Sequence, residues 1–350
     1  MNPVPFQIRL HIWLQRLVRW EFWAWRVVYL PVAVYWFFLA IKARAWVFFS
    51  AANPCMRFGG LVAYSKTDVT KLVPDRYLPN TIFIESNSAF EDISKQLVQK
   101  KMTFPLIIKP DMGERGRGVK IILTEVELIQ AISAADEKML LQVYENLPLE
   151  LGILYSRHPS EPVGKITSVV IKDFPVVIGD GKSTLLQLIL ANLRTRLSYK
   201  VHLRTFADRL SEIPAMGEKI QIVKIGNHML GTTFTNGNHL ISEDFEAVFD
   251  NLSKQIAGFY IGRFDIRTES MEELKKGNFK VIEVNGVNSE PCHIYDPKTP
   301  LWLGLRDLFA QWTRIYEISI ANHKLGAPYD SYSEIRREIR RHNGEVAKHV

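Results

Sequence analysis

The stretch FYIGRFDIR, residues 259–267, decides the fold together with FKVIEVN, residues 279–285. Apolar and aromatic residues alternate with polar ones in both, which predicts two β-strands. Side chains two positions apart share one face of a strand, so Arg263, Asp265 and Arg267 project from the first strand in the same direction. The pattern therefore predicts a strand with one polar face and one buried face.

The second strand carries matching oxygen ligands. Glu283 and Asn285 share a face by the same rule, and neighbouring strands would bring them into one cleft with Asp265. Such hard oxygen ligands suit Mg²⁺ that holds a triphosphate, and two such ions would neutralise the β- and γ-phosphates during transfer. A surface ladder of salt bridges among Arg263, Asp265 and Glu283 is the alternative interpretation.

Elsewhere the chain alternates between strand and helix patterns. Residues 103–110 and 119–123 are expected as strands, and a capping box at Thr124 opens a helix to about Asp136. Further strands are expected at 139–144, 149–156, 165–172 and 219–225, and helices at 183–193, 245–256 and 301–323. The last twenty residues are charged, and we expect them to be solvated. This mixture predicts an α/β (α+β) fold.

A glycine-rich stretch, DMGERGRG at 111–118, lies between the first two of these strands. It is either a plain hairpin turn or a flap whose backbone N–H groups, with Arg115 and Arg117, close over phosphates. Lys109 stands on the strand just before it. The glycines are followed by a strand and not by a helix, so the stretch is neither a Rossmann fingerprint nor a P-loop.

A second glycine motif, GDGKST at 179–184, resembles the end of a P-loop. A P-loop needs a further glycine at position 176, where the backbone wraps the phosphates, and this chain has Val176. We therefore interpret the motif as a turn.

Five segments in order resemble the ATP-grasp ligases, a family that includes D-alanine–D-alanine ligase and the ATP-grasp part of cyanophycin synthetase. They are PLIIKP, GERGRGV, LLQVYENLPLELGILY, GRFDIR and VIEVNG, at 105–110, 113–119, 140–155, 262–267 and 281–286. The resemblance covers roughly residues 61–300. It implies an ATP-grasp fold, in which two α+β subdomains grip ATP.

The resemblance also implies roles for single residues. The ATP contacts would come from Lys66, Lys109, Arg115, Gly116, Gln142, Val143, Tyr144 and Glu150, with residues 142–144 as the adenine hinge and Glu150 on the ribose hydroxyls. Gln142 stands where the ligases often have Glu. The ligands of Mg²⁺, or of Mn²⁺, would be Asp265, Glu283 and Asn285, and Arg263 would steady a tetrahedral intermediate.

The implied reaction joins a carboxylate to an amine. The carboxylate attacks the γ-phosphate of ATP to give an acylphosphate and ADP, and the amine then displaces phosphate. A kinase that phosphorylates a hydroxyl and a non-catalytic nucleotide-binding adaptor at the membrane are the alternatives. Family members begin with a larger front domain that helps to hold the first substrate, so the substrates stay open. The candidate substrate residues are Arg157, Lys172, His228, Arg267 and Glu290.

The first fifty residues differ from the rest. They hold six basic residues against Glu21 alone and six of the eight tryptophans, whereas the remaining chain is nearly balanced in charge. Basic and aromatic residues together point to an anionic membrane surface rather than to nucleic acid. The uncharged run at 27–41 has only fifteen residues, contains Pro31, which should kink it, and is basic on both flanks.

This pattern favours a re-entrant or interfacial helix over a spanning one, with a buried helix pair of a soluble protein as the other possibility. No small-residue cleavage site follows the run, which argues against a cleaved signal peptide. We expect attachment to the cytoplasmic face of the membrane, with lipid-linked or small-molecule substrates and a possible homodimer. Two distant cysteines suggest a reducing compartment.

The expected division of the chain follows from these patterns. A membrane-associated segment takes residues 1–50, a short preceding segment 51–102, the ATP-grasp domain 103–325 and a charged tail 326–350. We also expect ATP binding to survive removal of the membrane segment.

Overall fold

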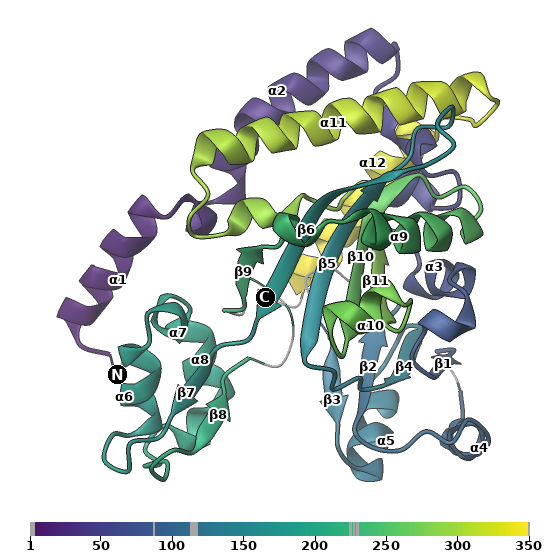
Figure 1. Ribbon diagram of the computed structural model, residues 1–350. Coiled ribbons are helices and arrows are strands. Elements are labelled where there is room, and N and C mark those ends of the chain that lie inside the picture. The colour runs from purple at the N-terminus through teal and green to yellow at the C-terminus, as the bar shows by residue number, and fades with distance from the viewer. Residues whose placement is uncertain are drawn as a thin grey trace.

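The computed structural model describes residues 4–86, 88–112, 118–223, 226, 228 and 231–348, the last seven of these by their backbone alone. Its first sheet is antiparallel and has the strand order β1-β4-β2-β3 (Figure 1). The strands are β1 (Thr81–Ile84), β2 (Leu106–Pro110), β3 (Lys120–Ile122) and β4 (Met139–Val143). Helices α4 (Phe90–Gln99) and α5 (Glu125–Ser133) share its apolar core. Because β1 pairs with β4, this sheet reaches across the boundary expected at residue 103.

The second sheet is also antiparallel and has the strand order β11-β10-β5-β6-β9. Its strands are β5 (Leu149–Ser156), β6 (Lys165–Asp173), β9 (Thr233–Asn236), β10 (Ile261–Thr268) and β11 (Lys280–Asn285). Helices α3 (Lys66–Leu72), α9 (Glu243–Gln255) and α10 (Met271–Lys275) contribute to the same buried core. The two strands on which the sequence interpretation rests are therefore neighbours, as predicted.

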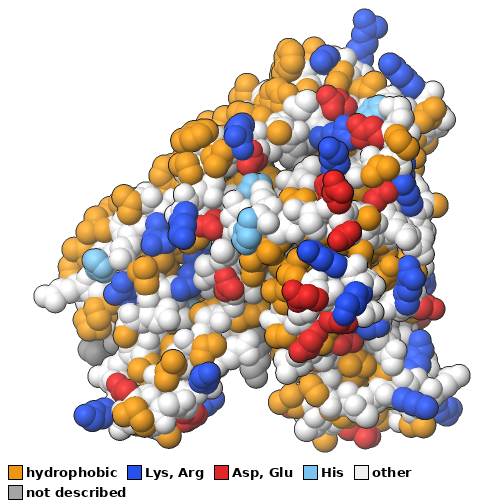
Figure 2. Space-filling model, viewed as in Figure 1, with side chains coloured by type: hydrophobic (Ala, Val, Ile, Leu, Met, Phe, Trp, Pro, Cys, Tyr) orange, Lys and Arg blue, Asp and Glu red, His pale blue; other side chains and the backbone are white. Residues whose placement is uncertain are grey.

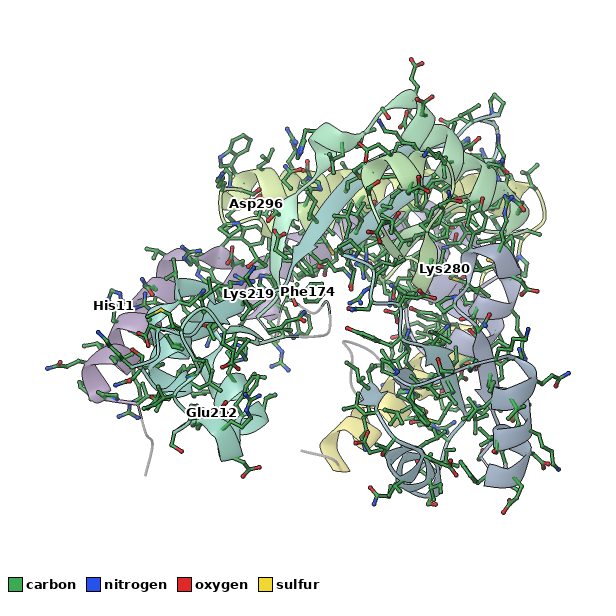
Figure 3. The ribbon with its side chains drawn as sticks, turned by 60° about the horizontal axis from the view of Figure 1, so that its bottom comes forward. His11, Phe174, Glu212, Lys219, Lys280 and Asp296 are labelled. Atoms are coloured by element: carbon green, nitrogen blue, oxygen red, sulfur yellow. The ribbon has the colours of Figure 1, made fainter. Side chains whose placement is uncertain are left out.

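A small subdomain is inserted between β6 and β9. It consists of α6 (Leu185–Ala191), α7 (Leu193–Leu197) and α8 (Tyr199–Thr205) with the pair β7 (Val176–Ile178) and β8 (Lys219–Gln221). Figure 3, which labels Glu212 and Lys219 here, shows it apart from the first sheet. The helix expected at 183–193 ends early because Asn192 caps the start of α7. Of the strand expected at 219–225, the structure has the first three residues, and 224–225 lie outside the described part.

The GDGKST motif is a turn, as predicted. The Asp180 carboxylate accepts hydrogen bonds from the backbone N–H groups of Lys182 and Ser183, at 2.9 and 2.6 Å. The motif then enters α6 through a capping box between Thr184 and Gln187. These backbone donors are occupied by the protein's own carboxylate, so they are not arranged to wrap phosphates.

Helices α2 (Trp25–Ala43) and α11 (Leu301–Lys324) lie together along one edge of the molecule (Figure 1). In that view α1 (Phe6–Val18) lies to one side of them, and α12 (Tyr332–Lys348) passes behind the second sheet. Helix α2 continues through Pro31 and packs in parallel on α11, with Val28 and Val32 near Leu308 and with Leu39 near Ile315. Among the described residues, α2 alone is long and apolar enough to cross a membrane, and 22% of it is buried.

The stretch expected as a solvated tail contains all of α12. Ile335 is buried in the same core as Val47 and Phe48, and Glu338 pairs with Arg57 at 3.2 Å. The expectation of a solvated tail is wrong for these positions. The charges that suggested it belong to the outer face of a helix whose inner face packs on the body.

Candidate active site

One cavity of about 530 Å³ connects the two sheets with the amino-terminal helices. Strands of both sheets line one end of it. Its other end is lined by residues that lie far apart in the sequence: Trp20, Trp23, Trp25, Val28 and Tyr29 from the amino-terminal segment, and Leu308, Gln311 and Trp312 from α11. The first fifty residues therefore form part of the wall of this cavity.

Lys109 crosses from the first sheet to the second. Its ammonium group donates to Gln142 Oε1 at 2.8 Å on β4 and to the carbonyl of Ile282 at 3.0 Å on β11. Gln142 in turn donates to Thr81 Oγ1 at 3.0 Å on β1. Val143 and Tyr144 follow on the same wall, so the predicted adenine hinge faces the cavity next to Lys109.

A buried ion network lies behind this hinge. Glu150 accepts from Lys172 at 3.1 Å through one oxygen and from Arg267 at 2.7 Å through the other. Arg267 also donates to the carbonyl of Glu145 at 2.5 Å, and its guanidinium lies 5.2 Å from the centre of the Tyr144 ring. Both oxygens of Glu150 are engaged by protein cations in this arrangement, and each keeps a further lone pair for a sugar hydroxyl.

The predicted metal ligands meet in register across β10 and β11. Asp265 pairs with Glu283 and Arg263 with Asn285 in the antiparallel ladder. Arg263 donates to both oxygens of Asp265, at 2.8 and 3.1 Å, and Lys172 lies 3.3 Å from the same carboxylate. Burial opposes ionisation of Asp265, yet Arg263 and Lys172 hold its pKa below the ordinary value. Of the salt-bridge ladder that was the alternative interpretation, the ion pair between Arg263 and Asp265 is present. This pair lines the cavity and does not lie on the outer surface.

The donor set fits a hard divalent cation bound together with phosphates. The described residues hold no group of three or more His, Cys, Asp or Glu side chains able to bind a metal alone. Two carboxylates and one amide oxygen leave coordination positions for phosphate oxygens and water, which is how proteins usually hold Mg²⁺. Five cationic side chains line the same cavity and can contact phosphate oxygens: Lys66, Lys109, Lys172, Arg263 and Arg267.

Glycine makes room for this cluster. A β-carbon at Gly152, on β5, would lie 3.0 Å from Asp265 Oδ1 and 2.8 Å from a methyl group of Val170. Only a residue without a side chain lets β5 pass this closely behind the carboxylate. Cys292 borders the cluster on another side, where Arg263 contacts its sulfur at 3.1 Å. Burial raises the pKa of Cys292 to about 11, which keeps the thiol protonated and unsuited to nucleophilic attack.

The cavity brings together most of the substrate candidates. Lys172, Arg267, His228 and Glu290 all line it, whereas Arg157 is not among its lining residues and instead lies over the ring of Tyr260. Arg115 and Gly116 lie outside the described residues. Burial, with a smaller contribution from Arg194, lowers the pKa of His228 to about 3, so its imidazole is neutral at physiological pH.

Several contacts were not predicted from the sequence. Asp111 accepts from the Ser65 hydroxyl and the Thr67 backbone at 2.9 and 2.7 Å, which ties the start of α3, where Lys66 stands, to the end of β2. Tyr64 donates to Asn285 Oδ1 at 3.0 Å and orients that side chain. Asp111 opens the glycine-rich stretch, but nothing in that stretch indicates its contacts with Ser65 and Thr67, and no local pattern marks Tyr64.

Three solved ligases are similar in structure to this chain over about three quarters of its length. The D-alanine–D-alanine ligase from Bacillus anthracis aligns with 15% identity and a TM-score of 0.44, over 75% of this chain and 69% of that one. The VanG D-Ala:D-Ser ligase from Enterococcus faecalis aligns with 15% identity and a TM-score of 0.41, over 72% of this chain and 61% of that one. The bifunctional glutathione synthetase from Pasteurella multocida aligns with 15% identity and a TM-score of 0.37, over 74% of this chain and 38% of that one. This chain thus spans less than half of the synthetase. No family model and no curated protein matches the sequence.

Four of the five segments on which the family resemblance rests lie on strands of the two sheets. PLIIKP ends in β2, the longest segment forms β4 and β5, and the last two form β10 and β11. The side chains to which the resemblance assigns ATP and metal, where the structure describes them, line the cavity between those sheets. This arrangement of strands around one cavity is the one that the resemblance to the ATP-grasp ligases implies.

Proposed function

We propose that the protein is an ATP-dependent ligase that joins a carboxylate to an amine through an acylphosphate and releases ADP and phosphate. The observation that carries this proposal is the register of β10 and β11. It sets Asp265 opposite Glu283 and Arg263 opposite Asn285 inside one buried cavity. A site for nucleotide binding alone would not require two ligand carboxylates with a guanidinium beside them.

Each of these residues would have a separate role in the reaction. Lys109 and Lys66 would orient the triphosphate, and bound Mg²⁺ would supply neutralisation of phosphate charge. A carboxylate oxygen attacks the γ-phosphorus and the bond to ADP breaks. The amine then attacks the acyl carbon, the bond to phosphate oxygen breaks, and the nitrogen gives up a proton. Arg263 would hold the negative charge that develops on the acyl oxygen.

The test is product analysis with the purified full chain, Mg·ATP and a panel of amino acids and lipid-derived acids and amines. We expect ADP release that depends on a carboxylate, and a hydroxamate when hydroxylamine replaces the amine, because hydroxylamine intercepts acylphosphates. A stable phosphorylated product formed without any amine would instead establish a phosphotransferase. Nucleotide binding without any ADP release would establish an adaptor.

Replacing Lys109 by Ala is expected to weaken ATP binding about tenfold or more. The substitution removes a buried charge-assisted donor, worth about 1.5–3 kcal/mol, and each 1.4 kcal/mol corresponds to about tenfold in affinity. Lys182→Ala is the matched control, because Lys182 is exposed in the GDGKST turn and should leave the dissociation constant unchanged. Calorimetric titration with ATP measures both. The reverse pattern would mean that the GDGKST turn binds phosphate.

The affinity for ATP should also fall as pH rises through about 8. Burial lowers the pKa of Lys109 to about 8, and Lys66 acts in the same direction while Glu283 opposes it. Below that pH the ammonium is already charged, whereas above it ATP must bind together with a proton, which costs up to tenfold per pH unit. The dissociation constant measured from pH 7 to 9 should rise in the wild type and stay flatter in Lys109→Ala.

We further propose that the protein acts at the cytoplasmic face of a membrane, with its amino-terminal helices in the lipid headgroup region. Phe6, Leu10, Trp13, Leu14 and Leu17 are exposed on one face of α1, and Val27, Leu30, Val34, Phe37, Phe38 and Ile41 on one face of α2. Figure 2 shows apolar side chains along this edge. Because the opposite face of α2 packs along α11, an interfacial position suits it better than a spanning one.

Placing charges on that face should release the protein from vesicles that contain anionic lipid. Leu30 and Val34 are 66% and 65% exposed, so the double substitution to Asp should leave the fold intact. A charged residue costs up to about 2.5–3.5 kcal/mol at a bilayer centre and less at its surface, so we expect at least tenfold weaker partitioning in a flotation assay.

The matched control is Val98→Asp with Val126→Asp, two equally exposed valines on α4 and α5. Equal vesicle binding by both double variants would contradict the proposal. A tag at the amino terminus that is labelled from outside the cytoplasmic membrane would show that the segment spans it.

A further inference from the structure

Glu290 is a half-buried carboxylate at the end of the cavity away from Lys109. The hydroxyl groups of Tyr29 and Tyr295 each donate to one of its two oxygens, the second at 2.5 Å. Burial, and then the carboxylate itself, raise the pKa of Tyr295 well above its ordinary value, which keeps this hydroxyl a donor. Within the described part of the chain, no Lys, Arg or His lies within 4 Å of Glu290, so a negative charge faces the cavity without a cation.

Aromatic rings surround this carboxylate. Trp20 and His228 lie 5.5 and 5.6 Å from Tyr295, centroid to centroid, and Trp20 lines the same end of the cavity. Carboxylates and aromatic faces together bind ammonium groups, by ion pairing and by cation–π attraction. Nε2 of His228 and Nε2 of Gln311 are buried in this wall, and neither has a hydrogen-bond partner among the described residues. An ammonium group can donate to His228 Nε2 when the imidazole carries its proton on Nδ1, whereas Gln311 Nε2 is an amide donor that an ammonium group cannot satisfy.

The same end of the cavity continues into an apolar wall. Trp25, Val28, Leu308 and Trp312 line it, and Trp25 and Trp23 also reach the exposed apolar face of the amino-terminal helices. Tyr29 belongs to α2, so one helix contributes both to that outer face and to the contacts of Glu290. A molecule whose amine lies at Glu290 would extend its other end toward the face that we place at the membrane.

From this arrangement we infer that the amine substrate is amphipathic, with a primary ammonium group on Glu290 and an apolar chain along Trp25 and Val28. The inference rests on the proposed ligase and names one of its two substrates. The negative charge of Glu290 disfavours a carboxylate at this end, so the acid would bind nearer Arg263, next to the phosphates. The ammonium enters from the lipid surface and gives one proton to Glu290. The neutral amine then attacks the acyl carbon, and its nitrogen gives up a second proton as phosphate leaves.

Binding of simple amphiphiles tests this inference without any turnover. Calorimetric titrations would use the full chain in neutral detergent micelles with Mg·ADP, and dodecylamine, dodecan-1-ol and butylamine as ligands. We expect dodecylamine to bind at least tenfold more tightly than dodecanol, which lacks the charge, and than butylamine, which lacks the chain. Equal affinity for dodecylamine and dodecanol would overturn the inference.

Substitutions distinguish recognition of the ligand's ammonium charge from recognition of its alkyl chain. Glu290→Gln should weaken the binding of dodecylamine about tenfold and leave the binding of dodecanol unchanged. Tyr295→Phe should also weaken the binding of dodecylamine. Trp25→Ala should weaken dodecylamine, whereas Trp302→Ala, an equally exposed tryptophan outside the cavity, should not. Unchanged dodecylamine binding in Glu290→Gln would also overturn the inference. These outcomes do not depend on ADP release, so failure of the ligase proposal and failure of the amine site are distinguishable.

Discussion

Glu283→Gln should release ADP at less than about one thousandth of the wild-type rate while remaining folded. Glu283 is one of two carboxylates in the proposed metal site, and the amide keeps its shape but loses the charge that would hold Mg²⁺ with phosphates. The fold should tolerate the change because the side chain is 35% exposed and its ion-pair partner, Lys66, is 3.6 Å away. Asp265 is a poorer choice, since its loss would leave Arg263 and Lys172 buried without their shared carboxylate.

The measurement is steady-state ADP release at saturating Mg²⁺ and ATP, with thermal unfolding to verify the fold. Glu273→Gln is the matched control, since Glu273 carries an exposed ion pair with Lys276 outside the main cavity. A high concentration of Mn²⁺ should recover part of the Glu283→Gln activity if the defect lies in metal binding. A Glu283→Gln protein that turns over at the wild-type rate would remove this residue from the metal site.

Arg263→Ala should lower kcat by about 10²–10³, the usual loss for one donor to an oxyanion. The guanidinium is held by Asp265 and Cys292 in the middle of the cavity, so it is oriented before any substrate binds. Because the donor acts on charge that appears during the reaction, the affinity for ATP should change little. Arg263→Lys should restore only part of kcat, since an ammonium group cannot keep the two-pronged contact with Asp265.

Rapid-quench measurement of acylphosphate formation, compared with equilibrium ATP binding, separates these effects. A structural role alone would weaken ATP binding and lower the unfolding temperature in step with kcat. If Arg263→Ala kept its kcat, the assignment of this residue to the developing oxyanion would be wrong.

Strand alternation was sufficient to predict the central part of the site. The polar faces of β10 and β11 could be predicted because polar and apolar residues alternate along each strand. Antiparallel pairing of the two neighbouring strands then places Asp265 opposite Glu283. The four-residue strand β1 was not predicted, because so short an apolar run carries no periodicity of its own. Its place beside β4 is decided by tertiary pairing.

The amino-terminal segment was predicted to be helical and apolar, but not to be part of the body. Helix α2 is apolar on all sides, so no periodicity indicates which face packs on α11 and which stays exposed. The contact between Tyr29 and Glu290 joins residues 261 positions apart, which no local pattern reveals. Removal of residues 1–49 would uncover Ile315 and Ile318 of α11, so point substitutions are the better test of this segment.

The double use of α2 has a thermodynamic consequence. If one helix contacts both the lipid surface and the amine site, binding at either place biases the same structural element, and the two equilibria are linked. Linkage is reciprocal, so any factor by which vesicles raise the affinity for the amine is also the factor by which the amine raises the affinity for vesicles. If that factor is greater than one, the protein occupied by the amine would reside longer at the membrane, and loss of the amine would favour its return to solution.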